Sequence, residues 1–188
     1  MNPKAQLFVD SVFRRKEEDS GFRSRMRGAG SAVRETAVWG DLAPFCNLEN
    51  ENLRAAYVLI GNSVAFEDKE VNGSQPFGRL LSLAWGNEKD AKLVDDQKQA
   101  QHPAAARLRR LLVCRDVPEL CRVLRPCLRL IRSRRPGELD YAQLLDDLLR
   151  FPFDPDKVKA RWVMDFSHSV LGKKEQAAEE AEKGEAHE

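Results

Sequence analysis

Apolar residues recur at intervals of three and four through most of the chain, and this helical period restricts the fold more than any other feature. The segment from Asn50 to Phe66 has it most clearly, with apolar residues at Leu53, Ala56, Tyr57, Ile60 and Val64. Stretches that alternate apolar and polar residues, as half-buried strands do, are nearly absent. The sequence therefore predicts an all-α protein.

Capping residues, glycines and prolines predict where the helices begin and end. The clearest start is at Asp116, which is followed by Pro118 and by Glu119 in the first turn. Pro126 lies inside the helix that begins there and is expected to kink it. We expect helices over about residues 5–17, 20–28, 50–66, 77–85, 103–114, 117–134, 141–151 and 155–170.

The segments between these helices are expected to be short turns and loops. Residues 31–38 add one or two helical turns, and residues 39–48 connect to the next helix with Pro44 and Phe45 packed against the core. Residues 67–75 are charged and contain Asn72-Gly73, which predicts an exposed loop. The first helix is expected to place four apolar side chains on one face: Leu7, Phe8, Val12 and Phe13.

The polar stretch 87–101 lacks an apolar period, so we place a boundary there. The sequence predicts two small helical-bundle lobes, residues 1–95 and residues 96–172. Residues 173–188 are a low-complexity tail with three Lys and six Glu. Such a composition cannot bury an apolar core, so we expect this acidic tail to be disordered.

Motifs that would indicate an enzyme are missing from the sequence. It contains no GxxxxGK[ST], GxGxxG or GxSxG motif. Asp146 and Asp147 are neighbours on a predicted helix, so their side chains point about 100° apart and cannot share a proton or a metal ion. We expect them to be solvated or paired with local arginines. We predict no catalytic residue, although a hydrolase or nuclease site built from distant carboxylates stays open.

The cysteines and histidines do not have the spacing of a metal site, so we predict no metal and no cofactor. We expect partly buried thiols in a reducing compartment at all four cysteines: Cys46, Cys114, Cys121 and Cys127.

No run of 18 apolar residues exists that could span a membrane. The N-terminus lacks the pattern of a secretory signal, which favours the cytoplasm.

The net charge of +1 conceals a strongly basic segment. Between Arg107 and Arg135 there are ten arginines, no lysine, and only Asp116 and Glu119 as acids. An ordinary charged helix face would mix the two signs. Arginine offers a planar fork of donors that suits phosphate oxygens. No aromatic residue lies in the segment, so we predict contact with nucleic-acid backbone rather than base stacking.

The candidate nucleic-acid-binding residues fall into four groups along the chain. Spacings of three, four and three residues place one group as a stripe on a single helix face. The groups are Arg23, Arg25 and Arg27; Arg107, Arg109 and Arg110; the stripe Arg122, Arg125, Arg129 and Arg132; and Lys157, Lys159 and Arg161.

Several segments, in the right order between Leu7 and Phe166, resemble those of the CasB family. They are residues 76–81 (S-x-G-R-x-L in the family), 106–112 (R-F-R-R-L-L), 124–125 (L-R-R), 139–149 (L-D-Y-x-x-L-L-x-D-L) and 161–166 (R-W-x-x-D-F). Two positions depart from the family pattern: Gly28 and Pro126 stand where it carries the second Arg of L-R-R-A and of L-R-R. These two positions cannot supply phosphate contacts, and Arg25 and Arg129 are the candidates to replace them.

The resemblance implies an all-α, non-enzymatic small subunit of the type I-E CRISPR surveillance complex, Cascade. Members of the family sit in the complex as a pair, which implies a homodimer there, against the backbone and large subunits. DNA and CRISPR RNA are the nucleic-acid partners, and the subunit helps to stabilise the R-loop. The alternative is a protein-only scaffold whose arginines contact acidic partner subunits.

Overall fold

A computed structural model describes residues 2–84 and 103–168, and within these ranges the chain forms helices joined by loops, with no β-strand. The all-α prediction is confirmed. The elements are α1 (Pro3–Glu18), α2 (Ser20–Gly28), the 3-10 helix η1 (Ala32–Val38), α3 (Trp39–Leu42), α4 (Glu51–Ala65), α5 (Phe77–Ala84), α8 (Pro103–Leu112), α9 (Val117–Arg134) and α10 (Tyr141–Arg150). A last helix covers residues 155–168 in its described part.

Short polar side chains fix the starts of the helices. The side chains of Asp19, Asn50, Asp116 and Asp140 each accept a hydrogen bond from the backbone N–H three residues later. These bonds satisfy donors that the first turn of a helix leaves unpaired. At the other end of α9, Arg135 adopts a left-handed conformation with φ 50° and stops the helix.

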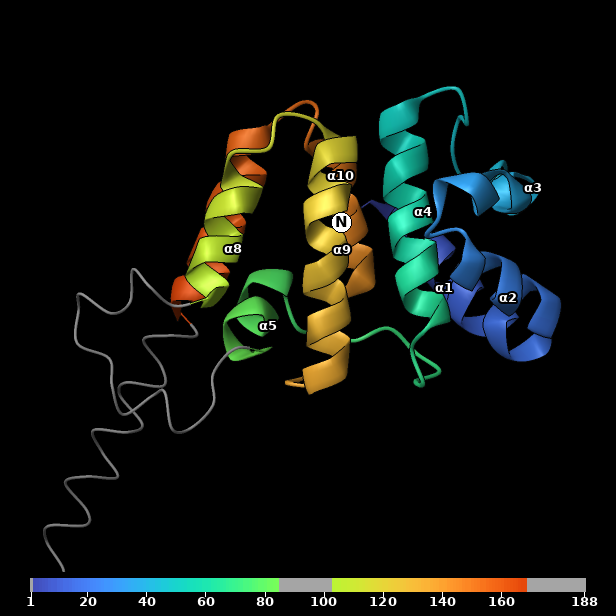
Figure 1. The fold of residues 1–188 in the computed structure, drawn as a ribbon, viewed down its shortest axis with the longest axis horizontal. Coiled ribbons are helices and arrows are strands. Elements are labelled where there is room, and N and C mark those ends of the chain that lie inside the picture. Colours follow the sequence, from blue (N-terminus) through green and yellow to red (C-terminus); the bar gives the residue numbers. More distant parts are fainter. Residues whose placement is uncertain (1, 85–102, 169–188) are drawn as a thin grey trace, which may run out of the picture.

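Helix α4 occupies the centre of the molecule. It packs against α1, α2, α9 and α10, and its side chains from Ala56 to Ala65 are all buried. Figure 1 shows α4 between α9 on one side and α1 and α2 on the other. Helices α5 and α8 pack against α9, so α9 has neighbours on both flanks.

Helices on both sides of the gap at 85–102 contact one another directly. One cluster of buried side chains includes Phe8 and Ile60 from the first half and Leu124 and Leu145 from the second. An isolated parallel bridge between Gln75 and Leu139 adds a backbone link. The predicted boundary between residues 95 and 96, and the predicted tail 173–188, lie outside the described residues.

Two predicted core positions are wrong. Leu7 is 62% exposed, because the buried face of α1 runs through Ala5, Phe8, Val9 and Val12 at offsets of three and four. Pro44 is exposed, whereas its neighbour Phe45 packs on the core as predicted. The segment predicted to be a plain connection also contains the short helix α3.

The loop after α4 is exposed at residues 68–71, as predicted, but its second part is held firmly. The Asn72 side chain donates to the Asp140 carboxylate and accepts from the Tyr141 N–H, both at 2.8 Å. At Gly73 an added Cβ would lie 2.3 Å from the backbone of Glu138. Glycine is therefore required for this close approach of two backbones.

Candidate nucleic-acid interface

The arginine stripe predicted on α9 lies opposite the buried face of that helix. Arg122 and Arg129 are exposed, and Arg125 and Arg132 are half-buried. At 100° per residue, the second pair is rotated about 60° from the first. The buried face holds Leu120, Cys121, Leu124, Cys127, Leu128 and Ile131. The stripe therefore has two arginines that project outward and two that turn toward α4.

Arg125 reaches across the gap between α9 and the end of α2. A Cβ added to Gly30 would lie 2.7 Å from Nη1 of Arg125 and 3.2 Å from the side-chain amide of Asn62 on α4. Burial is the main cause that lowers the pKa of Arg125; the charge of Arg129 also lowers it, whereas Cys121 and the carboxylate of Glu35 oppose the shift. The Asn62 amide itself donates to the carbonyls of Met26 and Arg27, both at 2.9 Å, which ties α4 to the end of α2.

Arg132 and Arg27 meet at the aromatic ring of Phe66, the residue that ends α4. The guanidinium carbon of Arg132 lies 4.7 Å from the ring centroid, and that of Arg27 lies 5.1 Å from it. Arg27 also donates from Nε to the carbonyl of Ala65 at 2.8 Å. Two candidate groups that lie far apart in sequence are thus brought together, and the contact uses an aromatic residue that the sequence reading did not select.

Seven of the candidate arginines form no ion pair with any residue in the described part of the chain, and five of these lie on α9 and at the end of α2. We call them the arginine face: Arg27, Arg122, Arg125, Arg129 and Arg132. Acids in the loop beside Arg132 have other partners, since Glu67 accepts from the Tyr141 hydroxyl and Asp68 pairs with Arg135. No carboxylate of the described residues is therefore in direct contact with this face; Glu35, which acts on Arg125 at longer range, is paired with Arg54.

The other two arginines of the α2 group have different surroundings. Arg25 lies 3.3 Å from the Asp41 carboxylate, which also accepts from Arg15 at 2.6 Å. Arg23 is half-buried, and its Nε has no hydrogen-bond partner. Arg25 is thus partly neutralised, which weakens it as the replacement for the arginine missing at position 28.

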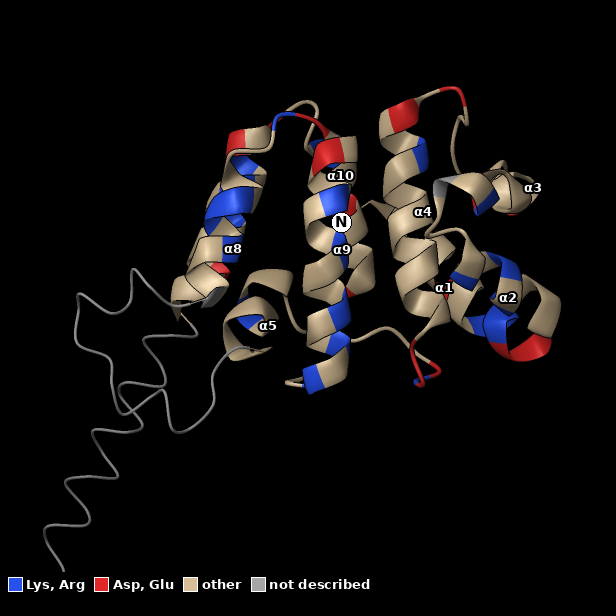
Figure 2. Ribbon diagram, viewed as in Figure 1, with Lys and Arg blue, Asp and Glu red and all other residues tan. Residues whose placement is uncertain are grey.

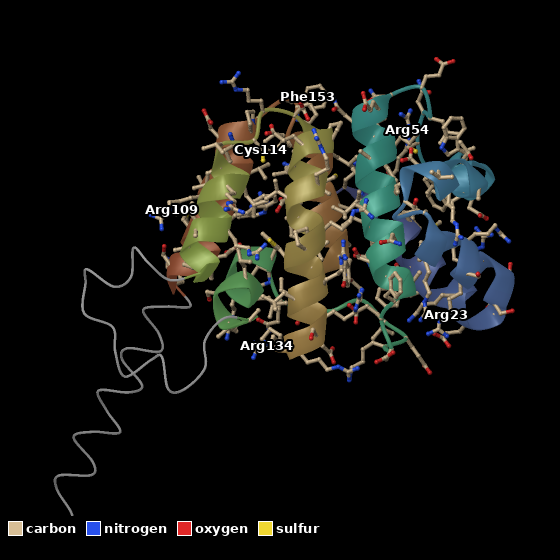
Figure 3. The ribbon with its side chains drawn as sticks, in the orientation of Figure 1. Arg23, Arg54, Arg109, Cys114, Arg134 and Phe153 are labelled. Carbon is tan, nitrogen blue, oxygen red and sulfur yellow. The ribbon has the colours of Figure 1, made fainter. Side chains whose placement is uncertain are left out.

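The arginines of α8 divide between the two sides of that helix. Burial raises the pKa of Cys127 on α9 to about 11, and the charge of Arg107 opposes that rise. The Arg107 guanidinium is therefore close enough to α9 to act on it. Arg109 and Arg110 are exposed, and in Figure 3 Arg109 projects from α8 away from α9, on the opposite side of the molecule from Arg23.

The three candidates on the last helix form a separate group, because this helix lies behind α8 in Figure 1. Arg161 is bound to the buried carboxylate of Asp147. Lys159 lies 5.4 Å from the ring centroid of Phe151, and Lys157 is exposed. Of this group, only Lys157 has neither an acidic nor an aromatic partner among the described residues.

Asp146 and Asp147 are buried, so the predicted solvation of these acids is wrong and their predicted arginine partners are confirmed. Asp147 accepts from Trp162 Nε1 at 2.7 Å, from Gln143 at 3.0 Å and from Arg161. Burial raises its pKa to about 6, against the opposing effects of Trp162 and Arg161. Asp146 pairs with Arg150 at 3.2 Å. The two carboxylates point to different partners, which fits a structural role.

Figure 2 shows how the charges are arranged over the molecule. Lys and Arg lie along the visible sides of α2, α8 and α9, whereas Asp and Glu lie mostly at helix ends and in loops.

No group of three or more His, Cys, Asp and Glu within the described ranges could hold a metal ion. The four cysteines are free thiols, three of them buried. None of the described helices combines the length and apolar character needed to cross a bilayer.

Several segments that carried the family resemblance contact one another in the structure. A Cβ on Gly78 of α5 would lie 2.3 Å from the carbonyl oxygen of Trp162 on the last helix. Phe77 and Trp162 pack edge to face with ring centroids 5.2 Å apart. Trp162 also binds Asp147 of α10. Phe77, Gly78 and Trp162 therefore hold helices together, whereas Arg125, from segment 124–125, belongs to the arginine face.

Together, the fold and the site define a small all-α protein with a carboxylate-poor arginine surface suited to a polyanion. The chain belongs to the Cse2 family: the family model described as CRISPR-associated protein Cse2 matches residues 23–166. This confirms the resemblance to CasB. Comparison with curated proteins gave no match.

Two crystal structures of proteins from Thermus thermophilus have the same fold. One is a CRISPR-associated protein of the Cse2 family, with 23% sequence identity and a TM-score of 0.64. The other is a CasB protein, with 21% identity and a TM-score of 0.63. Each alignment covers 89% of this chain and 99% of the other. At these identities the likeness establishes the architecture.

Proposed function

We propose that the chain is the non-catalytic small subunit of a type I-E Cascade complex, where it binds nucleic-acid backbone and stabilises the RNA-guided R-loop in antiviral defence. The observation that carries this proposal is the arginine face, whose five guanidinium groups form no ion pair within the described residues. Membership of a CRISPR-associated family supplies the context.

The chemistry of this surface favours contact without base reading. Guanidinium groups bind phosphate oxygens through charge-assisted hydrogen bonds, and each contact releases counterions from the nucleic acid. Phosphate contacts hold a strand in place without carrying sequence information. In an RNA-guided complex this suffices, because base pairing with the guide selects the target.

The same proposal includes its protein partners. We place a second copy of the chain and the backbone and large subunits of the complex beside it, in the cytoplasm. At a second surface, Phe153 is 88% exposed at the turn after α10 (Figure 3), and we propose this side chain as an apolar contact with a protein neighbour. A protein-only scaffold stays the second candidate on this observation.

Reversing charge at the two outward arginines of α9 tests the proposal. Arg122→Glu combined with Arg129→Glu should leave the helical circular dichroism unchanged, because both side chains are exposed. Binding of a single-stranded oligonucleotide in a mobility-shift assay should fall by more than about tenfold. The log–log dependence of affinity on salt should also become shallower by about 1.4, the value for two lost phosphate contacts.

A charge-matched control is available on α1. Lys4→Glu combined with Arg14→Glu makes the same change in net charge at two exposed positions of another helix. This control should bind with nearly the wild-type affinity. Equal losses of oligonucleotide affinity in both double variants would mean that net charge alone, and not the arginine face, determines binding. Absence of binding by the wild-type chain, together with co-purification with an acidic subunit, would favour the scaffold.

A further inference from the structure

Phe66 has an unusual position for a large apolar residue. It caps the C-terminal end of α4, remains 37% exposed, and has the guanidinium groups of two arginines over its ring, at 5.1 Å for Arg27 and 4.7 Å for Arg132. The two guanidinium carbons are therefore no farther apart than the sum of these distances. One ring holds together two like charges that come from α2 and α9.

Both arginines lie over the ring and keep N–H groups without an acceptor in the described part of the chain. A guanidinium attracts an aromatic ring through its flat face, whereas it binds phosphate through the N–H groups at its edge. Arg27 donates only from Nε, to the Ala65 carbonyl. Among the described residues, the Nη groups of Arg27 and all nitrogens of Arg132 have no hydrogen-bond acceptor.

Local acids do not complete this arrangement. Glu67, the next residue after Phe66, accepts from the buried Tyr141 hydroxyl, and Asp68 is paired with Arg135. Two guanidinium groups that share one ring repel each other, and an anion that contacts both would reduce that repulsion. An anionic group with several acceptor oxygens has the chemistry to bind the unused N–H groups of both arginines.

We propose that Phe66 is a positioning residue, which holds Arg27 and Arg132 as a phosphate-binding pair for one backbone segment of a nucleic-acid strand. This rests on the proposed function and adds to it a contact that joins the first half of the chain to the second. Contact with the ring restricts the positions of both guanidinium groups, so that less conformational freedom is lost when the strand binds.

The test uses the full chain and a single-stranded oligonucleotide, with Phe66→Leu as the main variant and Phe66→Tyr as the conservative one. Loss of two cation–π contacts at an exposed site should weaken binding by about threefold to tenfold in Phe66→Leu. Phe66→Tyr keeps the ring and should stay within about twofold of wild type. Thermal unfolding checks both variants, and Phe66→Met replaces Phe66→Leu should the latter fail to fold.

Two further measurements separate positioning from other roles. In an Arg27→Gln, Arg132→Gln background, Phe66→Leu should cause no further loss, because the groups that it positions are gone. With an abasic oligonucleotide, Phe66→Leu should cause the same fold loss as with the normal strand. A loss that appears only when bases are present would overturn the proposal, because the ring would then stack on bases.

The outcomes distinguish this inference from the function on which it rests. A wild-type chain that does not bind single-stranded nucleic acid contradicts the proposed function itself. A wild-type chain that binds, and that Phe66→Leu or Phe66→Met does not weaken, contradicts the role of Phe66 alone. An undiminished effect of Phe66→Leu in the double glutamine background also contradicts it.

Discussion

Arginines have opposite surroundings in two regions of the molecule. On the arginine face, five guanidinium groups from α2 and α9 have no carboxylate partner within the described residues. Between α10 and the last helix, Arg161 binds the buried carboxylate of Asp147, which also accepts from Gln143 and Trp162. In the second region, which we call the Asp147 network, the charged groups have their partners within the chain.

The number of arginines in a segment therefore does not identify a binding surface. The sequence reading counted Arg161 and Arg132 in the same class, but only the structure separates the arginine that a carboxylate holds from the arginine that lies on an exposed ring. We therefore expect changes in the Asp147 network to alter stability and changes on the arginine face to alter binding.

The largest expected effect is on stability, from Asp147→Ala. Removing this carboxylate leaves the Trp162 N–H unpaired in the core and leaves Arg161 without its partner. We expect a loss of about 2–4 kcal/mol in the free energy of unfolding, at the lower end because Arg161 is partly solvated. Urea denaturation followed by circular dichroism measures it.

The exposed acid Asp156 on the last helix provides the control for that change. Asp156→Ala should alter the free energy of unfolding by less than about 0.5 kcal/mol. Oligonucleotide affinity of the folded Asp147→Ala protein should match wild type. A large loss of oligonucleotide affinity in this variant, at a temperature where it is folded, would contradict the separation of roles between the Asp147 network and the arginine face.

A second, smaller effect is the pH dependence that Asp147 gives to stability. Its pKa rises from an ordinary value of 3.8 to about 6 in the folded chain. Because the folded state binds the proton more tightly, the stability from this group is complete below about pH 3.8 and is lost as the pH rises through about 6. Asp147→Asn keeps an acceptor for Trp162 and does not titrate.

Unfolding free energies of wild type and Asp147→Asn, measured between about pH 4 and pH 7, check this expectation. The wild-type value should fall relative to the variant by about 2 kcal/mol over that range. If the difference in unfolding free energy between the two proteins stays constant over this pH range, Arg161 keeps Asp147 ionised throughout. The contact between Asp147 and Arg161 would then be an ordinary ion pair.

The smallest expected effect comes from Gly30→Ala, at the edge of the arginine face. The new Cβ would lie 2.7 Å from Arg125 Nη1, and a long side chain can move away from such a contact at little cost. We expect a change of less than about 1 kcal/mol in the free energy of unfolding. Oligonucleotide affinity should change by about twofold, measurable by titration. Matched Gly40→Ala, which meets no atom within 4 Å, should leave affinity unchanged.

The part of the site that follows from one helix could be predicted from the sequence. The stripe on α9 and its buried opposite face depend only on a rotation of about 100° per residue; the structure has the buried face, and Arg122 and Arg129 of the stripe are exposed while Arg125 and Arg132 are half-buried. The all-α fold was predictable for the same reason, since its capping residues and apolar period act within one element.

The part that depends on packing between helices could not be predicted. Phe66 lies 39 positions from Arg27 and 66 from Arg132, and no local pattern relates the three. The pairing of Arg25 with Asp41, and the burial of Asp147, likewise require the positions of other helices. Leu7 is not three or four residues from Phe8, Val12 or Phe13, so the helical period itself turns it to solvent, against the prediction.

Helix α9 is packed on both flanks by other helices and belongs to the same cluster of buried side chains as α1, α4 and α10. The outward residues Arg122 and Arg129 are thus held about 10 Å apart along the axis of a helix that its neighbours keep in place. Under the proposed function, a flexible single strand would adjust the spacing of its phosphates to this fixed separation. The helix would then set the local extension of the bound strand.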